Sequence, residues 1–284
     1  MSSSSFTAEE RLDREYNPRL RVLNFADIFR RWKEEAVRAR QSQEVRANLS
    51  YGDADHERLD FFPAQPGSPL LIFLHGGYWR ALDKDDFSWI APAYVRAGIA
   101  VAVVNYGLLP ATPLRQIVRQ IRRACVWLYA NAATLRIDAH RIACSGHSAG
   151  AHLTAMMLAT DWQGEAPHLP VRLLSAAVSI SGVFDLAPLR QAPFLRDDLA
   201  LDEATARALS PIHLPLANEA PLFRAVGELE SGEFHRQSHL IAQAWPAACT
   251  TEVMSVPETD HMSVCEAFAD GKSTLFEAVC SFVR

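Results

Sequence analysis

A five-residue motif, Gly-His-Ser-Ala-Gly at positions 146–150, carries the clearest chemical signal in the sequence. It fits the pattern G-x-S-x-G and lies between a stretch expected to form a strand (141–145) and one expected to form a helix (149–160). In that context the serine sits on a sharp turn with its hydroxyl exposed, and the flanking glycines leave room for a strained backbone. We therefore expect Ser148 to be a catalytic nucleophile.

A second motif, His-Gly-Gly-Tyr-Trp at positions 75–79, follows directly after a continuous apolar run. Adjacent glycines let the backbone turn two N–H groups toward one point, as an oxyanion hole for acyl transfer requires. We expect the amides of Gly77 and Tyr78 to form this hole with the amide of Ala149, the first residue of the helix. Gly76 is the alternative donor.

The general base is expected late in the chain, because hydrolases with this serine motif have the chain order Ser, acid, His. His261 meets that expectation, since it follows an apolar stretch at 251–256 that is expected to form the last strand. Five other histidines lie in expected helices, within the serine motif or before the glycines, and fit the role less well: His75, His147, His152, His235 and His239.

The acid that orients the base should follow the preceding strand, expected at 222–226. Glu230 is the best-placed carboxylate after that strand, and Glu228 is the second. Asp185, after an earlier strand, is a third alternative, whereas Asp260 is adjacent to the base and poorly placed to orient its ring. The carboxylate holds the imidazole tautomer and stabilises the imidazolium, so either Asp or Glu can serve.

These side chains need strands that end at one edge of a sheet. The apolar runs at 70–74 and 99–104 are typical of strands buried on both faces of a parallel sheet. Strand and helix patterns then alternate to the C-terminus, with helices expected at 113–135, 149–160, 233–245 and 273–283. This alternation predicts an α/β fold, with a mostly parallel, doubly wound sheet and helices on both faces.

Two regions depart from the alternation. Residues 1–50 are expected to form an irregular arm to about residue 20 and then an amphipathic helix. Residues 184–221 contain five prolines and no strand pattern, which is typical of a small cap over a site. We expect one domain over residues 1–284. The residues expected to wall a small pocket for aromatic groups are Trp32, Tyr78, Phe184 and Phe194.

Composition excludes several classes of protein. The 284 residues are 49% hydrophobic, enough to bury a core. The formal net charge of -5, without a Lys/Arg run, argues against nucleic acid as a partner.

The five cysteines are scattered without a C-x-x-C pair, and no secretion signal or membrane span is evident, so we expect a cytoplasmic protein. No metal-ligand or nucleotide-binding motif occurs, so no metal or cofactor is expected. The expected partner is a small-molecule substrate, and an edge strand and the N-terminal helix are compatible with a homodimer.

The motifs at 75–79 and 146–150, the latter followed by Ala-His-Leu, resemble those of the arylformamidase (kynurenine formamidase) branch of the α/β-hydrolases. This branch is akin to the hormone-sensitive-lipase-like esterases. The stretch GELESGEFHRQS at 227–238 and the pair Asp260-His261 extend the resemblance, which runs from about residue 69 to the C-terminus. It implies an α/β-hydrolase fold with Ser148 as nucleophile, Glu230 as acid, where the family often has Asp, and His261 as base.

The resemblance also implies hydrolysis of N-formyl arylamines or small carboxylic esters without a metal. Together with the motifs, it predicts a serine hydrolase that removes a small acyl or N-formyl group from an aryl amide or ester through an acyl-enzyme. A carboxylesterase for short-chain esters is the first alternative. A non-catalytic small-molecule-binding homologue is the second, although such proteins typically lack the nucleophile or the base, and Ser148 and His261 are both present.

Overall fold

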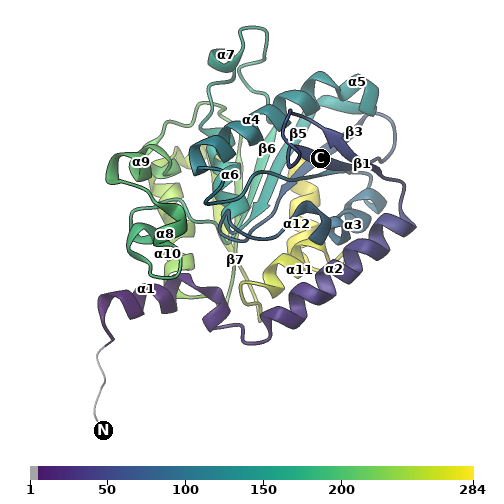
Figure 1. The fold of residues 1–284 in the computed structure, drawn as a ribbon. Helices are drawn as coiled ribbons and strands as arrows, with labels where there is room; N and C mark the ends of the chain where they lie inside the picture. The colour runs from purple at the N-terminus through teal and green to yellow at the C-terminus, as the bar shows by residue number, and fades with distance from the viewer. Residues whose placement is uncertain (1–5) are drawn as a thin grey trace.

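An eight-stranded sheet organises the computed structural model, which describes residues 6–284 (Figure 1). Residues 1–5, the beginning of the expected arm, lie outside the described part. The strand order is β1-β2-β4-β3-β5-β6-β7-β8. All pairings from β4 to β8 are parallel, and β2 pairs antiparallel with both β1 and β4. The bounds are β1 Arg46–Ser50, β2 Arg58–Phe62, β3 Ser68–Leu74, β4 Ala100–Val104, β5 Ile137–His147, β6 Ala176–Ile180, β7 Leu222–Gly227 and β8 Thr250–Val256.

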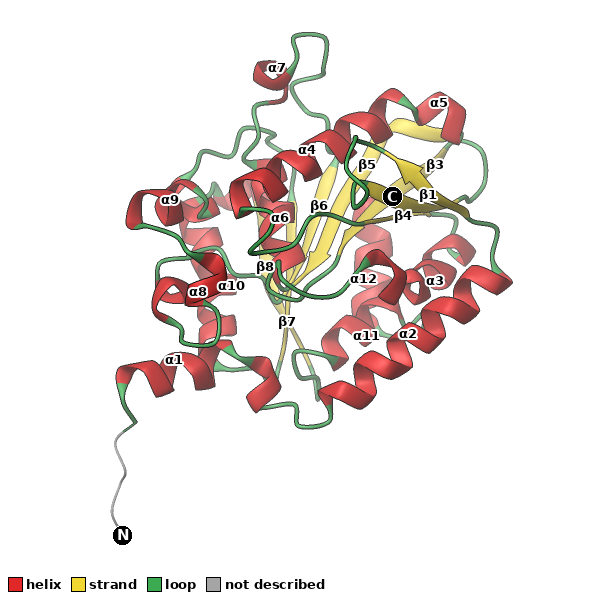
Figure 2. Cartoon of the chain, viewed as in Figure 1, coloured by secondary structure: helices red, strands yellow, loops and turns green. Residues whose placement is uncertain are grey.

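Helices cover both faces of this sheet (Figure 2). Their bounds are α1 Ala8–Tyr16, α2 Phe25–Ser42, α3 Ala91–Arg96, α4 Leu114–Ala130, α5 Ala132–Leu135, α6 Ala149–Leu158, α7 Trp162–Glu165, α8 Arg196–Leu199, α9 Glu203–Ala208, α10 Gly232–Ala244, α11 Ser263–Ala269 and α12 Thr274–Val283. Along β3, Leu70 and Ile72 pack in the core with α4 and α6, whereas Leu71 and Phe73 pack in a second core with α2, α3 and α12. Successive side chains of a strand point to opposite faces, so a wholly apolar β3 supplies both cores. The predicted α/β architecture is confirmed.

The winding of the sheet reverses at β3. The strand that follows it in the chain, β4, pairs on one side of β3, and β5 pairs on the other. Loops at the carboxyl ends of strands that flank such a reversal diverge and leave a crevice, where α/β proteins bind their ligands. The His-Gly-Gly-Tyr-Trp segment follows β3 and Ser148 follows β5, so both motifs lie at this crevice.

The beginning of the chain is more ordered than the sequence predicted. An irregular arm was expected to about residue 20, but α1 occupies Ala8–Tyr16 and a short 3-10 turn follows at Pro18–Leu20. The expectation was wrong because a capping box starts a helix here. The Thr7 side chain accepts from the Glu10 amide, and the Glu10 carboxylate accepts from the Thr7 amide.

Residues 184–221 contain no strand, in agreement with the sequence pattern, and are built from α8, α9 and short 3-10 turns. Another element was not anticipated: α11 begins two residues after His261 and packs against α12. Within the described part of the chain, none of the helices combines the length and the apolar character needed to cross a bilayer.

Candidate active site

Ser148 occupies a strained turn between β5 and α6. Its backbone has φ 56° and ψ -116°, a conformation that costs a non-glycine residue about 1–3 kcal/mol and is typical of functional sites. The positions at the two ends of the motif, 146 and 150, must be glycine because neither has room for a side chain. A Cβ on Gly150 would lie 2.0 Å from the carbonyl oxygen of Leu74, and one on Gly146 would lie 2.3 Å from the backbone of Gly150. Helix α6 therefore starts directly against β3, which fixes Ser148 at the crevice.

His261 and Glu230 meet across the ends of the last two strands. Nδ1 of His261 lies 2.6 Å from Oε2 of Glu230, and both side chains are almost completely buried. The other carboxylate oxygen of Glu230 accepts hydrogen bonds from the amide of Gly227, at 2.8 Å, and from the hydroxyl of Ser181. These contacts hold the carboxylate in one orientation toward the imidazole.

The alternative acids bind other groups. Glu228 accepts from the amide of Glu258 at 2.9 Å, and Asp185 accepts from the amide of Ala187 at 3.0 Å. The Asp260 carboxylate accepts hydrogen bonds from the backbone amides of Met262 and Ser263, where α11 begins. Of the four carboxylates weighed from the sequence, Glu230 is the one that the structure brings to His261.

His147, which fitted the role of base less well because it lies within the serine motif, contacts His261. Its Nε2 lies 2.7 Å from the backbone carbonyl oxygen of His261, and the two rings are 4.7 Å apart. Burial, and secondly the nearby His261, hold the pKa of His147 well below its usual range. A neutral His147 therefore donates its Nε2–H and ties the loop that carries His261 to the turn that carries Ser148.

The other four candidate histidines lie outside the pocket that contains Ser148. His75 contacts the carbonyl oxygen of Gly76 through Nδ1 at 2.8 Å and stacks on Tyr106, so it holds the loop that carries the glycines. His152 is buried on α6, whereas His235 and His239 lie on α10 with their side chains partly or fully exposed. None of these four is among the residues that line the pocket described below.

His152 predicts a measurable pH effect on stability. Burial lowers its pKa from 6.5 to about 4, and its Nε2–H donates to the carbonyl oxygen of Leu209 at 2.7 Å. The unfolded chain binds this proton below pH 6.5 and the folded chain does not, so stability is full above pH 6.5 and falls as the pH drops to 4. At 1.36 kcal/mol per unit the loss is about 3 kcal/mol. Denaturant unfolding of His152→Gln, which keeps a donor, should show a shallower fall, and an equal fall in both proteins would contradict this assignment.

The glycine motif offers free backbone donors beside Ser148. Gly77 has φ 98°, and a Cβ there would lie 2.3 Å from a backbone carbonyl oxygen four residues later. Across residues 6–284, no acceptor faces the N–H groups of Gly77, Tyr78 or Ala149. Gly76 is close as well, since a Cβ there would lie 3.3 Å from that of Ser148. These amides are therefore free to donate to a bound group.

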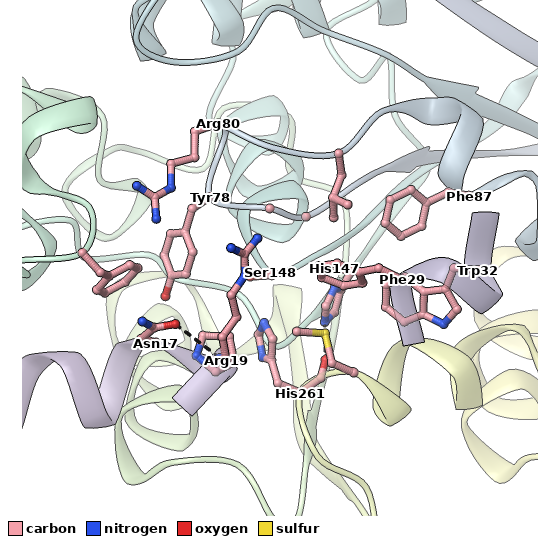
Figure 3. Close-up of a pocket in the computed structure, with 16 residues that line it drawn as sticks. Asn17, Arg19, Phe29, Trp32, Tyr78, Arg80, Phe87, His147, Ser148 and His261 are labelled. Atoms are coloured by element: carbon pink, nitrogen blue, oxygen red, sulfur yellow. Dashed lines mark hydrogen bonds between the residues drawn. The ribbon is translucent and has the colours of Figure 1, made fainter. Parts of the chain in front are cut away.

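A pocket of about 630 Å³, measured out to its open mouth, contains both Ser148 and His261 (Figure 3). Its walls are largely aromatic and apolar, and its charged side chains are two arginines. The lining residues are Asn17, Pro18, Arg19, Phe29, Trp32, Gly76, Gly77, Tyr78, Arg80, Leu82, Phe87, His147, Ser148, Phe194, His261 and Met262.

Three of the four expected wall residues, Trp32, Tyr78 and Phe194, lie in this lining, and the fourth does not. Phe184 is completely buried in the core, so its expected place in the pocket was wrong. The side chain of Gln237 accepts from the amide of Phe184 at 2.7 Å, and the ring lies against Gly182. These contacts direct the ring into the core.

The segment between α1 and α2 closes one side of the pocket, which the sequence did not reveal. Tyr78 donates its hydroxyl hydrogen to the backbone carbonyl of Tyr16 and so attaches the glycine motif to the end of α1. On α2, the indole N–H of Trp32 donates to Glu266 of α11 at 2.7 Å. The pocket therefore joins the first and last parts of the chain.

The parallel sheet and the strand–Ser148–helix turn define an α/β-hydrolase. Residues 61–243 match the BD-FAE family. A kynurenine formamidase from Salmo salar is 32% identical over 84% of this chain and 82% of its own length. Carboxylesterase NlhH from Mycobacterium tuberculosis is 36% identical over 37% of this chain and 34% of that protein. The solved structure of a candidate thioesterase from Silicibacter sp. TM1040 matches with a TM-score of 0.82 and 32% identity, covering 94% of this chain and 97% of that one.

The chain belongs to the BD-FAE family and to the group of α/β-hydrolases that includes the kynurenine formamidases. The resemblance found in the motifs is thereby confirmed over most of the sequence. The protein is a hydrolase of the arylformamidase-like or carboxylesterase type.

Proposed function

We propose that this hydrolase cleaves N-formyl arylamines, and aryl esters of similar size, through an acyl-enzyme on Ser148. The observation that carries the proposal is the 2.6 Å contact between Glu230 and His261, because His261 lines the same pocket as Ser148, a serine on a strained turn. A nucleophile, a base and a group that orients the base are the parts of a serine hydrolase. The presence of Ser148 and His261 in one pocket, with Glu230 bound to His261, also argues against a binding protein that has lost catalysis.

The first half of the reaction forms the acyl-enzyme. Because Nδ1 of His261 faces Glu230, Nε2 is left to take the proton of the Ser148 hydroxyl as its oxygen attacks the formyl or acyl carbon. The carbonyl oxygen becomes an oxyanion, which the amides of the glycine motif and of Ala149 stabilise. His261 then gives its proton to the leaving amine or alkoxide as the carbon–nitrogen or carbon–oxygen bond breaks.

The second half repeats the chemistry with water. His261 takes a proton from water as the water oxygen attacks the ester carbon on Ser148, and the same amides stabilise the second oxyanion. Collapse of this intermediate releases formate or another carboxylate and returns the proton to Ser148. Glu230 remains ionised throughout and stabilises the imidazolium.

The pocket walls support an aromatic substrate. Trp32 and Phe29 come from α2, and the rings of Tyr78 and Phe194 meet edge to face at 5.1 Å. A flat arylamine or phenol presents the faces and edges that such rings accept. The carboxylesterase alternative uses the same residues and differs only in the bond that is cleaved.

Hydrolysis of N-formylkynurenine beside 4-nitrophenyl acetate tests the proposal. We expect both to be cleaved, with kcat/KM for the formamide of about 10⁴ M⁻¹s⁻¹ or more. Prior treatment with a fluorophosphonate should abolish both activities and place one phosphonyl group on the peptide containing Ser148. Cleavage of the ester alone would establish the carboxylesterase alternative, and labelling of another residue would refute the assignment of the nucleophile.

We also propose a cytoplasmic location. All five cysteines are unpaired, and four of them are buried. Unpaired cysteines are typical of proteins from reducing compartments.

A further inference from the structure

His147 places in the pocket a hydrogen-bond acceptor that the mechanism above does not use. Its Nε2 lies 2.7 Å from the carbonyl oxygen of His261, and a carbonyl oxygen only accepts, so this nitrogen carries the ring hydrogen. Burial holds the pKa of His147 well below its usual range, so the ring is neutral. A neutral imidazole has a single N–H, and Nδ1 is therefore left with a free lone pair.

Nδ1 of His147 opens on the pocket beside the nucleophile. It has no hydrogen-bond partner within residues 6–284, and it is not among the side-chain atoms that are both unpartnered and enclosed by protein. His147 directly precedes Ser148 in the chain, and both line the pocket (Figure 3). A Cβ on Gly76 would lie 3.2 Å from Nδ1 of His147 and 3.3 Å from the Cβ of Ser148. The ring nitrogen and the nucleophile therefore flank the same backbone position.

The other side-chain acceptors of the lining are already engaged. None of the 16 lining residues is Asp or Glu. The side-chain carbonyl oxygen of Asn17 accepts from the amide of Arg19, and the hydroxyl of Tyr78 is bound to the backbone of Tyr16. Apart from the two reacting side chains, His147 is thus the lining residue whose side chain offers an oxygen or nitrogen acceptor that no described protein group uses.

Cleavage of an amide gives such an acceptor a task that cleavage of an ester does not. When His261 protonates the leaving nitrogen of the tetrahedral intermediate, the proton goes to the lone pair of that nitrogen. The hydrogen that the nitrogen already carries must then point elsewhere. The leaving oxygen of an ester carries no hydrogen. An acceptor for the N–H therefore stabilises the transition state for breaking the carbon–nitrogen bond and contributes nothing to breaking the carbon–oxygen bond.

We propose that Nδ1 of His147 accepts a hydrogen bond from the N–H of the scissile amide as the tetrahedral intermediate breaks down, and so enables this site to cleave N-formyl arylamines as well as esters. No proton moves to His147. His261 gives its proton to the nitrogen, the carbon–nitrogen bond breaks, and the arylamine leaves with both hydrogens. The inference deepens the proposed function and rests on it. His147 is then a residue that determines specificity for amides over esters.

Two substitutions separate this role from the contact with His261. Glutamine can place its amide nitrogen where Nε2 of histidine lies, so His147→Gln keeps the donor to His261 and removes the acceptor at Nδ1. Asparagine can place its side-chain oxygen near the position of Nδ1, so His147→Asn keeps an acceptor and loses the donor. The substrates are formanilide and phenyl formate, which differ only in an N–H in place of an oxygen. The measured quantity is the ratio of kcat/KM for formanilide to that for phenyl formate, after subtraction of spontaneous hydrolysis.

We expect His147→Gln to lower this ratio about tenfold, as the loss of one hydrogen bond made in the transition state predicts. His147→Asn should slow both reactions, because the loop that carries His261 is no longer tied, but should keep a higher ratio than His147→Gln. The matched control is His152→Gln, the same substitution at a buried histidine of α6 that does not line the pocket. It should leave the ratio unchanged.

An unchanged ratio for His147→Gln would overturn the inference alone. Equal losses on the two substrates would also overturn it, because they would show that His147 only holds the loop of His261. A lower ratio in His147→Asn than in His147→Gln would overturn it as well. If the wild type cleaved phenyl formate but not formanilide, the carboxylesterase alternative would hold and the inference would fail. If it cleaved neither, the proposed function itself would fail.

Discussion

Hydrolysis by Ser148→Ala should fall roughly 10⁵- to 10⁶-fold in kcat, the effect of removing the nucleophile from a complete Ser-His-acid triad. Alanine keeps the Cβ and tolerates the same φ of 56° as well as serine does, so the turn between β5 and α6 should persist. Stopped-flow assays with 4-nitrophenyl acetate should show no acyl-enzyme burst, while the free energy of unfolding stays within about 0.5 kcal/mol of the wild type.

The matched control is Ser145→Ala, three residues earlier on β5. The hydroxyl of Ser145 donates to the carbonyl oxygen of Ile72 at 2.7 Å inside the sheet and does not reach the pocket. This variant should lose about 1 kcal/mol of stability and keep its kcat. Retention of more than about one hundredth of the wild-type rate by Ser148→Ala would show that another group is the nucleophile.

Glu230→Gln should lower kcat about 10⁴-fold with little change in KM. The amide can still accept a hydrogen bond but no longer carries the charge that stabilises the imidazolium, and its NH2 group can face Nδ1 and favour the wrong tautomer. Glu230→Asp should recover part of the rate, because a carboxylate is kept while its reach from the turn after β7 is shortened. Steady-state kinetics on both the formamide and the ester would measure these losses.

Glu228→Gln is the matched control, two residues away in the same turn. Its carboxylate binds the amide of Glu258 and does not contact His261, so kcat should remain within about a factor of two. A larger loss for Glu228→Gln than for Glu230→Gln would mean that the turn rearranges on substrate binding. The acid would then have to be reassigned.

The sequence identified the residues whose position depends on local structure. Ser148 and the strand-to-helix turn follow from glycine spacing and apolar pattern, because the turn is built by neighbouring residues alone. As the acid that orients the base, Glu230 ranks above Glu228 in the sequence, but the sequence pattern alone does not decide between them. Which of the two carboxylates faces His261 depends on how the turn is closed, here by the hydrogen bond between Glu230 and the amide of Gly227.

Residues brought in by tertiary packing were missed or misplaced. Phe184 was expected in the pocket because of its type and its place after a strand, but the contact of its amide with Gln237 of α10 turns it into the core. The place of Arg19 in the pocket lining gave no signal in the sequence, because it requires α1 to dock beside the glycine motif. The contact of His147 with the carbonyl of His261 likewise joins two segments 114 residues apart.

The contact between Trp32 and Glu266 spans 234 positions of the sequence. Trp32 lines the same pocket as His261, the proposed base, which is translated near the end of the chain. Such long-range contacts form late, because ordering them requires most of the intervening chain to be in place. A ribosome-bound nascent chain can complete the strand-to-helix turn with its serine well before it holds a base or a finished wall. Catalytic activity in this protein is therefore a reporter of the fully assembled chain, and partly folded or truncated forms should be silent in an assay even when most of the sheet is built.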